Sequence, residues 1–173
     1  MPAAQMKVVV GVDFDHTSDD AITEGLALLA AGVASELHVL QIFAPFVGGR
    51  SAPQQWFTSE RQLVERAPVA LRLRVRTLAQ RAGLSCDEAR MLLQATVGEA
   101  VESLLVASRA PAADVLIVGS EAHCGRGRAK LGSVVSELVA RGDCPVLIAR
   151  SSASRRLRRG LECNVLLSAR RLS

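Results

Sequence analysis

A small set of residues in this chain has the types and spacing expected of an anion-binding crevice. Gly119 follows an apolar, strand-like run, and Gly132 and Ser133 open a later segment with the apolar spacing of a helix. Backbone N–H groups at the start of that helix would lack intrahelical partners, and the helix dipole would favour an anion such as a phosphate there. Asp13 ends another apolar run, and its carboxylate can accept hydrogen bonds from a ribose or a base edge. For Asp13 and Ser133 taken singly, capping a turn or a helix is the simpler interpretation.

A parallel α/β sheet would bring these residues to one edge. Five apolar runs are predicted strands, and they cover residues 6–12, 36–43, 88–95, 115–118 and 146–149. Helices are predicted between them, from Thr17 or Ser18 to Gly32, over 59–81, over 97–109, and from Gly132 to near Cys144, with Pro68 expected to kink or split the second one. This alternation predicts a doubly wound, Rossmann-like parallel sheet of five strands in the order 3-2-1-4-5 with four helices. The first and fourth strands are then neighbours at the point where the strand order reverses.

The composition indicates one globular domain with a basic end. With 173 residues, of which 49% are hydrophobic and 22% charged, the chain can bury a sizeable core. Residues 151–173 contain six arginines and one glutamate and carry +5, whereas the whole chain carries +4, so residues 1–150 carry −1. We therefore expect a domain over 1–150 and a basic, disordered tail over 151–173.

The tail has three interpretations. The arginine-rich stretch 155–159 could contact nucleic acid or acidic lipid, although it lacks the aromatic residues that favour base stacking. A disordered, solubilising end is the favoured interpretation. Residues 164–168 could instead add a short strand to a sheet edge or to a neighbouring subunit.

The rest of the composition favours a cytoplasmic protein. No apolar run approaches the roughly 20 residues of a membrane span, and residues 1–7 lack the pattern of a signal peptide. We therefore expect no membrane contact. The cysteines are scattered and form no C-x-x-C pair, which predicts free thiols rather than disulfides or metal ligands.

Both ends of this domain resemble the universal stress protein family. Val-Gly-Val-Asp at 10–13 is similar to the family's first strand, and Gly119-Ser120, Gly132-Ser133 and Cys-Pro-Val-Leu-Ile-Ala at 144–149 resemble its C-terminal half. The resemblance covers about residues 5–150. In nucleotide-binding members the motif is Gly, two residues, Gly, nine residues, then Gly-Ser or Gly-Thr. It falls here on Gly119, Ala122, Gly132 and Ser133, with alanine in place of the second glycine.

The resemblance implies an adenine nucleotide alpha hydrolase-like fold that binds ATP, with or without Mg²⁺. It implies that the adenine lies near Asp13 and the backbone of Ile42. The phosphates would lie against Gly119, Ala122, Gly132, Ser133 and Val134. Relatives commonly pair through their last strand, so a homodimer that forms along residues 146–149 is also implied.

The chain departs from the family pattern at two positions. If residue 122 needs a positive φ, Ala122 costs about 1–2 kcal/mol, and its methyl group narrows the approach to a phosphate. Nearby glycines could let the loop relax, and its cations could reach a triphosphate or simply be solvated; these residues are Gly125, Gly127, Arg126, Arg128 and Lys130. Asp15 stands where many relatives carry serine. Together with Asp13, Asp19 and Asp20 it could hold Mg²⁺ or, without metal, repel ATP. The alternative for Asp19 and Asp20 is that they are helix-start acids that interact with the dipole.

Three functions fit these patterns. The first is a cytoplasmic stress-response protein that binds ATP as a regulatory ligand. The second, motivated by Ala122 and Asp15, is a nucleotide-free dimeric interaction or signalling protein of the same fold. The third is an enzyme that hydrolyses ATP or phosphorylates itself on Ser133 or Ser120. Because the chain has neither a P-loop Lys-Ser/Thr pair nor a candidate triad, we expect any hydrolysis to be slow and incidental.

Overall fold

The computed structural model describes residues 6–13, 17–45, 59–110, 112–120 and 132–149. The elements follow in the order β1 (Met6–Val12), α1 (Thr17–Ala30), β2 (Ala34–Phe43), α2 (Glu60–Ala82), a 3-10 turn (Glu88–Arg90), β3 (Met91–Val97), α3 (Ala100–Arg109), β4 (Val115–Gly119), α4 (Ser133–Arg141) and β5 (Val146–Ala149). Neighbouring strands are parallel, in the order β3-β2-β1-β4-β5. The predicted fold class and strand order are confirmed.

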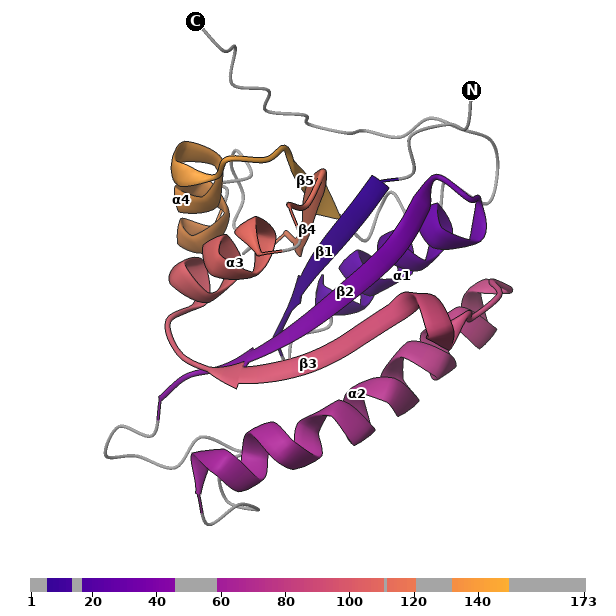
Figure 1. The fold of residues 1–173 in the computed structure, drawn as a ribbon, viewed down its shortest axis with the longest axis horizontal. Coiled ribbons are helices and arrows are strands. Elements are labelled where there is room, and N and C mark those ends of the chain that lie inside the picture. Colours follow the sequence, from indigo (N-terminus) through magenta and orange to yellow (C-terminus); the bar gives the residue numbers. More distant parts are fainter. Residues whose placement is uncertain (1–5, 14–16, 46–58, 111, 121–131, 150–173) are drawn as a thin grey trace, which may run out of the picture.

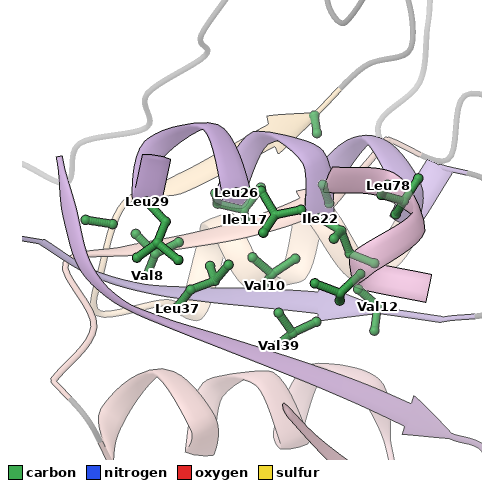
Figure 2. Close-up of a cluster of buried hydrophobic side chains, with 14 of the residues drawn as sticks. Val8, Val10, Val12, Ile22, Leu26, Leu29, Leu37, Val39, Leu78 and Ile117 are labelled. Atoms are coloured by element: carbon green, nitrogen blue, oxygen red, sulfur yellow. The ribbon is translucent and has the colours of Figure 1, made fainter. Parts of the chain in front are cut away.

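Helices cover both faces of this sheet (Figure 1). α1 and α2 pack on one face, where Val10 of β1 lies beneath Ile22 and Leu26 of α1 (Figure 2). α3 and α4 cover the opposite face, where Val9 of β1 is buried together with Leu138 of α4. Because the central strands are buried on both faces, β1 and β4 are nearly continuous apolar runs in the sequence.

The third strand begins later than predicted. Residues Glu88–Arg90 form the 3-10 turn, and the Asp87 side chain accepts a hydrogen bond from the Ala89 N–H (3.3 Å). Arg90 does not interrupt the strand but anchors it, since its guanidinium donates to the carbonyls of Ala34 and Ser35 at the start of β2. β3 therefore runs over Met91–Val97 instead of 88–95.

The second helix is one continuous element that contains Pro68. The prediction that this proline could split the helix is therefore wrong. Ser59 caps its first turn by accepting from the Gln62 N–H, and Gly83 ends it in the left-handed region at φ 68°. None of the helices over the described residues is long and apolar enough to cross a membrane.

Candidate functional site

A cavity of about 380 Å³ opens at the carboxyl ends of β1 and β4. This is the point at which the strand order reverses, the usual ligand position in such sheets. The volume falls within the range of about 300–1,000 Å³ that is typical of ligand pockets. Most of the predicted site residues line it, namely Asp13, Ile42, Gly119, Gly132 and Val134.

Asp13 lies at the end of β1 and forms a reciprocal pair with Ser18. The Ser18 hydroxyl donates to Oδ1 of Asp13 (2.5 Å) and accepts from the Asp13 N–H (3.0 Å). Ser18 lies in the first turn of α1 and is only 3% exposed. The pair connects the end of β1 to the first turn of α1, so Asp13 has a structural role that needs no ligand. Asp13 is nevertheless exposed at the cavity wall, so its carboxylate can also accept a hydrogen bond from a ligand.

Gly119 ends β4 and lies against the first residue of α1. A Cβ atom built on Gly119 would stand 2.6 Å from the Thr17 carbonyl oxygen and 2.9 Å from the Thr17 hydroxyl oxygen. Both distances are far shorter than van der Waals contact. The close packing of α1 on β4 therefore requires glycine at this position, independently of any ligand.

α4 begins at the cavity with a glycine as its N-cap. Its first residue is Ser133, and the N-cap residue is Gly132, which provides no side-chain hydrogen bond. The interpretation of Ser133 as the N-cap is therefore wrong; its side chain is exposed, and it is not among the residues that line the cavity. The first turn of α4 contains no acidic residue. The start of this helix thus retains the partial positive charge that attracts anions.

The lining of the cavity is mainly apolar. Ile42, Leu104 and Val118 contribute to it. Ile42 lies one residue beyond Gln41, the last β2 residue that is paired with β1, and it pairs with Thr96 of β3. An apolar wall with polar groups at its ends is suited to a planar ring that carries polar substituents.

The start of α3 also lines the cavity, and the sequence reasoning missed it. Glu99 is the N-cap of α3, and its Oε2 accepts from the Glu102 N–H at 3.1 Å. The preceding Gly98 donates its N–H to the Phe43 carbonyl (3.0 Å). The signal was a glycine followed by a capping residue directly after a strand. It was obscured because the helix was predicted to begin at residue 97, whereas its first residue is Ala100.

The acidic patch proposed from the sequence is only partly described. Asp19 and Asp20 lie in the first turn of α1 as expected, but Asp19 accepts a hydrogen bond from Nε of Arg74 (2.7 Å) and forms an ion pair with it. In the part of the chain that the structure describes, no group of three or more acidic, histidine or cysteine side chains could hold a metal ion. Asp15 and Ala122 lie outside the described residues, as do the loop cations considered above.

The thiols in the described ranges do not have the character of nucleophiles. Cys86 and Cys144 are free, and burial raises the pKa of both thiols. A raised pKa lowers the thiolate fraction at neutral pH and therefore the reactivity.

Known proteins resemble this chain both in sequence pattern and in fold. A family model described as the universal stress protein family matches residues 6–150. Among solved structures, a universal stress protein in complex with cAMP is 23% identical with a TM-score of 0.57, over 85% of this chain and 98% of that chain. Universal stress protein UspA from Lactobacillus plantarum is 19% identical with a TM-score of 0.62, over 85% and 99%. A universal stress protein from Archaeoglobus fulgidus in complex with dAMP is 12% identical with a TM-score of 0.52, over 83% and 97%.

A comparison with curated proteins finds no significant match. At identities below 25%, the solved structures establish similarity of fold alone. The family model extends from the start of β1 through the end of β5 and thus covers most of the chain. Together with the strand order and the position of the cavity, this match shows that the chain belongs to the universal stress protein family.

Proposed function

We propose that the cavity binds an adenine nucleotide, with ATP as the first candidate. In this proposal the nucleotide is a regulatory ligand of a stress-response protein and not the substrate of an efficient enzyme. The solved relatives in complex with cAMP and dAMP make adenine nucleotides the first class of ligand to test.

The contrast between the helices that begin at the cavity carries this proposal. α1 has Asp19 and Asp20 in its first turn. α3 has Glu99 as its N-cap and Glu102 in its first turn. α4 has no acid there, and its N-cap Gly132 contributes no side-chain acceptor. Because carboxylates offset the positive end of a helix dipole, the start of α4 is where a phosphate would be favoured.

The Asp13 part of the cavity lining favours hydrogen-bond donors on a ligand. The carboxylate of Asp13 is exposed there and can accept from ribose hydroxyls or from an amino group of a base. The apolar side chains of Ile42 and Leu104 provide contact area for the base. A hydrogen-bond acceptor, an apolar surface and an anion-attracting helix start are the kinds of group that an adenosine phosphate needs.

In this proposal Mg²⁺ would bind together with the nucleotide phosphates. Its chemical contribution would be to neutralise part of the phosphate charge, which would reduce the repulsion from the Asp13 carboxylate. Binding measured with Mg²⁺ and with a chelator tests this contribution.

Isothermal titration calorimetry on the full chain tests the proposal. We expect ATP to bind with a dissociation constant below about 1 mM, and Asp13→Ala to weaken it by about tenfold, the effect of losing one hydrogen bond to a charged group. Asp143→Ala is the matched control, because this exposed acid pairs with Arg109 and does not line the cavity. If neither ATP, ADP, AMP nor cAMP bound at millimolar concentration, the proposal would be wrong.

A nucleotide-free interaction or signalling protein of the same fold is the second candidate. Two observations favour it, since Asp13 and Gly119 both have structural roles that need no ligand. This candidate predicts that Ala122→Gly creates or strongly increases the affinity for ATP. An ATP affinity that this substitution leaves unchanged would count against it.

We further propose a cytoplasmic homodimer that forms along β5. β5 is the last strand of the described sheet, and Val146–Ala149 is entirely apolar. Light scattering on the purified chain tests the oligomeric state. A monomer at all concentrations up to about 1 mM would contradict the dimer, since even a weak complex is populated there.

A further inference from the structure

Arg74 connects α2 to the wall of the cavity. Its Nη1 donates to the Asp13 carbonyl oxygen (2.8 Å), and its Nε donates to Oδ1 of Asp19 (2.7 Å). The side chain is 24% exposed, whereas the side chains of Arg72 and Arg76 on the same helix are 57% and 60% exposed. Arg74 is thus the partly buried member of this group of arginines.

The two hydrogen bonds reach both β1 and α1. Asp13 directly follows β1, and Asp19 lies in the first turn of α1. A guanidinium is planar, so two donors on one group fix the relative position of two acceptors better than a flexible ammonium can. Arg74 therefore connects α2 to both ends of a segment that belongs to β1 and α1.

The same segment carries the reciprocal Asp13–Ser18 pair. Ser18 orients the carboxylate and the N–H of Asp13, whereas Arg74 holds its carbonyl. Contacts to opposite sides of the residue leave little freedom for the carboxylate at the cavity wall. A preorganised acceptor binds a ligand more tightly because less side-chain and loop entropy is lost on binding.

The charge of Arg74 also affects the site. The ion pair with Asp19 places a positive charge in the acidic first turn of α1. It thereby offsets part of the negative charge next to the proposed nucleotide without a metal ion.

We propose that Arg74 is a positioning residue for nucleotide recognition and acts through Asp13. The inference rests on the proposed function, because it assigns Arg74 the task of holding the acceptor that meets the nucleoside. Arg74 is not among the residues that line the cavity, so its effect on affinity would be indirect.

The test compares ATP binding by calorimetry across a set of variants of the full chain. Arg74→Gln removes the charge and the two-pronged donor, and Arg74→Lys retains the charge only. Arg76→Gln is the matched control, since Arg76 also lies on α2 but pairs with Glu88. We expect Arg74→Gln and Arg74→Lys to weaken ATP binding by about tenfold and about fivefold, and Arg76→Gln by less than about twofold.

A double-mutant cycle separates positioning from general damage. In the Asp13→Ala background the carboxylate is already absent, so Arg74→Gln should cost less than about twofold in ATP affinity. A tenfold loss in that background as well would show that Arg74 does not act through Asp13, and would overturn the inference. Full affinity in Arg74→Lys would also overturn it, because charge alone would then be sufficient.

Hydrogen exchange in the absence of ligand tests the inference without relying on ATP affinity. Arg74→Gln should speed hydrogen exchange of the Asp13 N–H, which donates to Ser18, while Arg76→Gln should leave it unchanged. If Arg74→Gln is poorly folded, Asp19→Asn weakens one of the two anchors and should accelerate the same amide. Unchanged exchange in these variants would overturn the inference alone. Absence of ATP binding by the unmodified chain would overturn the proposed function and this inference with it.

Discussion

Replacing Gly119 by alanine tests why a glycine stands at the end of β4. The added Cβ atom would meet the Thr17 backbone, with its oxygen at 2.6 Å and its carbonyl carbon at 2.8 Å. Neither atom belongs to a flexible side chain, so the clash can be relieved only if the start of α1 moves away from β4. We therefore expect Gly119→Ala to destabilise the fold even when no nucleotide is present.

The size of the effect follows from the kind of atom that is displaced. Inserting a methyl group into a packed region typically costs 1–3 kcal/mol, and a backbone obstacle places this variant at about 2–3 kcal/mol. For a chain of this size, that corresponds to a melting temperature lowered by roughly 4–12 °C. The control is Gly98→Ala at the same cavity, because a Cβ there would meet only the Ser103 hydroxyl oxygen, at 3.0 Å. That hydroxyl can rotate away, so we expect a loss below about 1 kcal/mol.

Chemical denaturation and nucleotide titration of both variants provide the assay. Because of the clash with Thr17, we expect Gly119→Ala to lower the midpoint of urea unfolding in nucleotide-free protein. A Gly119→Ala variant that unfolds like the unmodified chain but no longer binds ATP would refute this reasoning. The glycine would then serve the approach of a phosphate and not the contact with Thr17.

Three further predictions concern other side chains. Glu99→Ala should lower the free energy of unfolding by about 0.5–2 kcal/mol, because α3 loses its cap. Glu99→Gln can still cap the helix, and it should bind ATP more tightly in calorimetry because a negative charge is removed from the cavity. Burial raises the pKa of the Cys144 thiol, so iodoacetamide at pH 8 should alkylate Cys144 more slowly than it alkylates the amino acid cysteine in solution. Burial also lowers the pKa of His38, an effect that a hydrogen bond with Gln94 partly offsets. Below about pH 6.5 the unfolded chain therefore binds more protons at His38 than the folded chain does, and stability falls as the pH is lowered. His38→Gln removes this titration, so the urea midpoint of the variant should decline less between about pH 7 and 5.5.

The fold could be predicted because its main signals are local. Continuous apolar runs such as Val115–Gly119 indicate strands that are covered on both faces, and helical spacing between them indicates crossovers. Right-handed connections then leave few possible strand orders. Apart from the split expected at Pro68, the errors lie at element ends, as at Glu88–Arg90, where a side-chain cap and contacts to β2 favour a 3-10 turn over an extended strand.

The site could be predicted only where its residues follow strands directly. Asp13 and Gly119 end adjacent strands, and the topology alone brings them to one edge. Arg74 could not be found in this way, because it lies in the middle of a helix and contacts residues that are 55 and 61 positions away. Nothing in the spacing of arginines along α2 distinguishes it from Arg72 or Arg76. Only the packing of α2 beside α1 determines which arginine reaches Asp13 and Asp19.

The residues with the strongest sequence signal are therefore not the ones that best distinguish a nucleotide-binding protein from one that has lost its ligand. Asp13 pairs with Ser18 at the start of α1, and Gly119 leaves room for Thr17, so both would be favoured in either protein. The start of α4 is different, because a glycine N-cap without a side-chain acceptor satisfies none of the first N–H groups of that helix. Serine or aspartate as the N-cap would satisfy one of these N–H groups, although the gain in stability over glycine is only roughly a few tenths of a kcal/mol. Glycine as the N-cap therefore costs little and leaves the start of α4 open to an anion, in a cavity that the exposed Asp13 also lines, which favours the nucleotide-binding alternative over the nucleotide-free one.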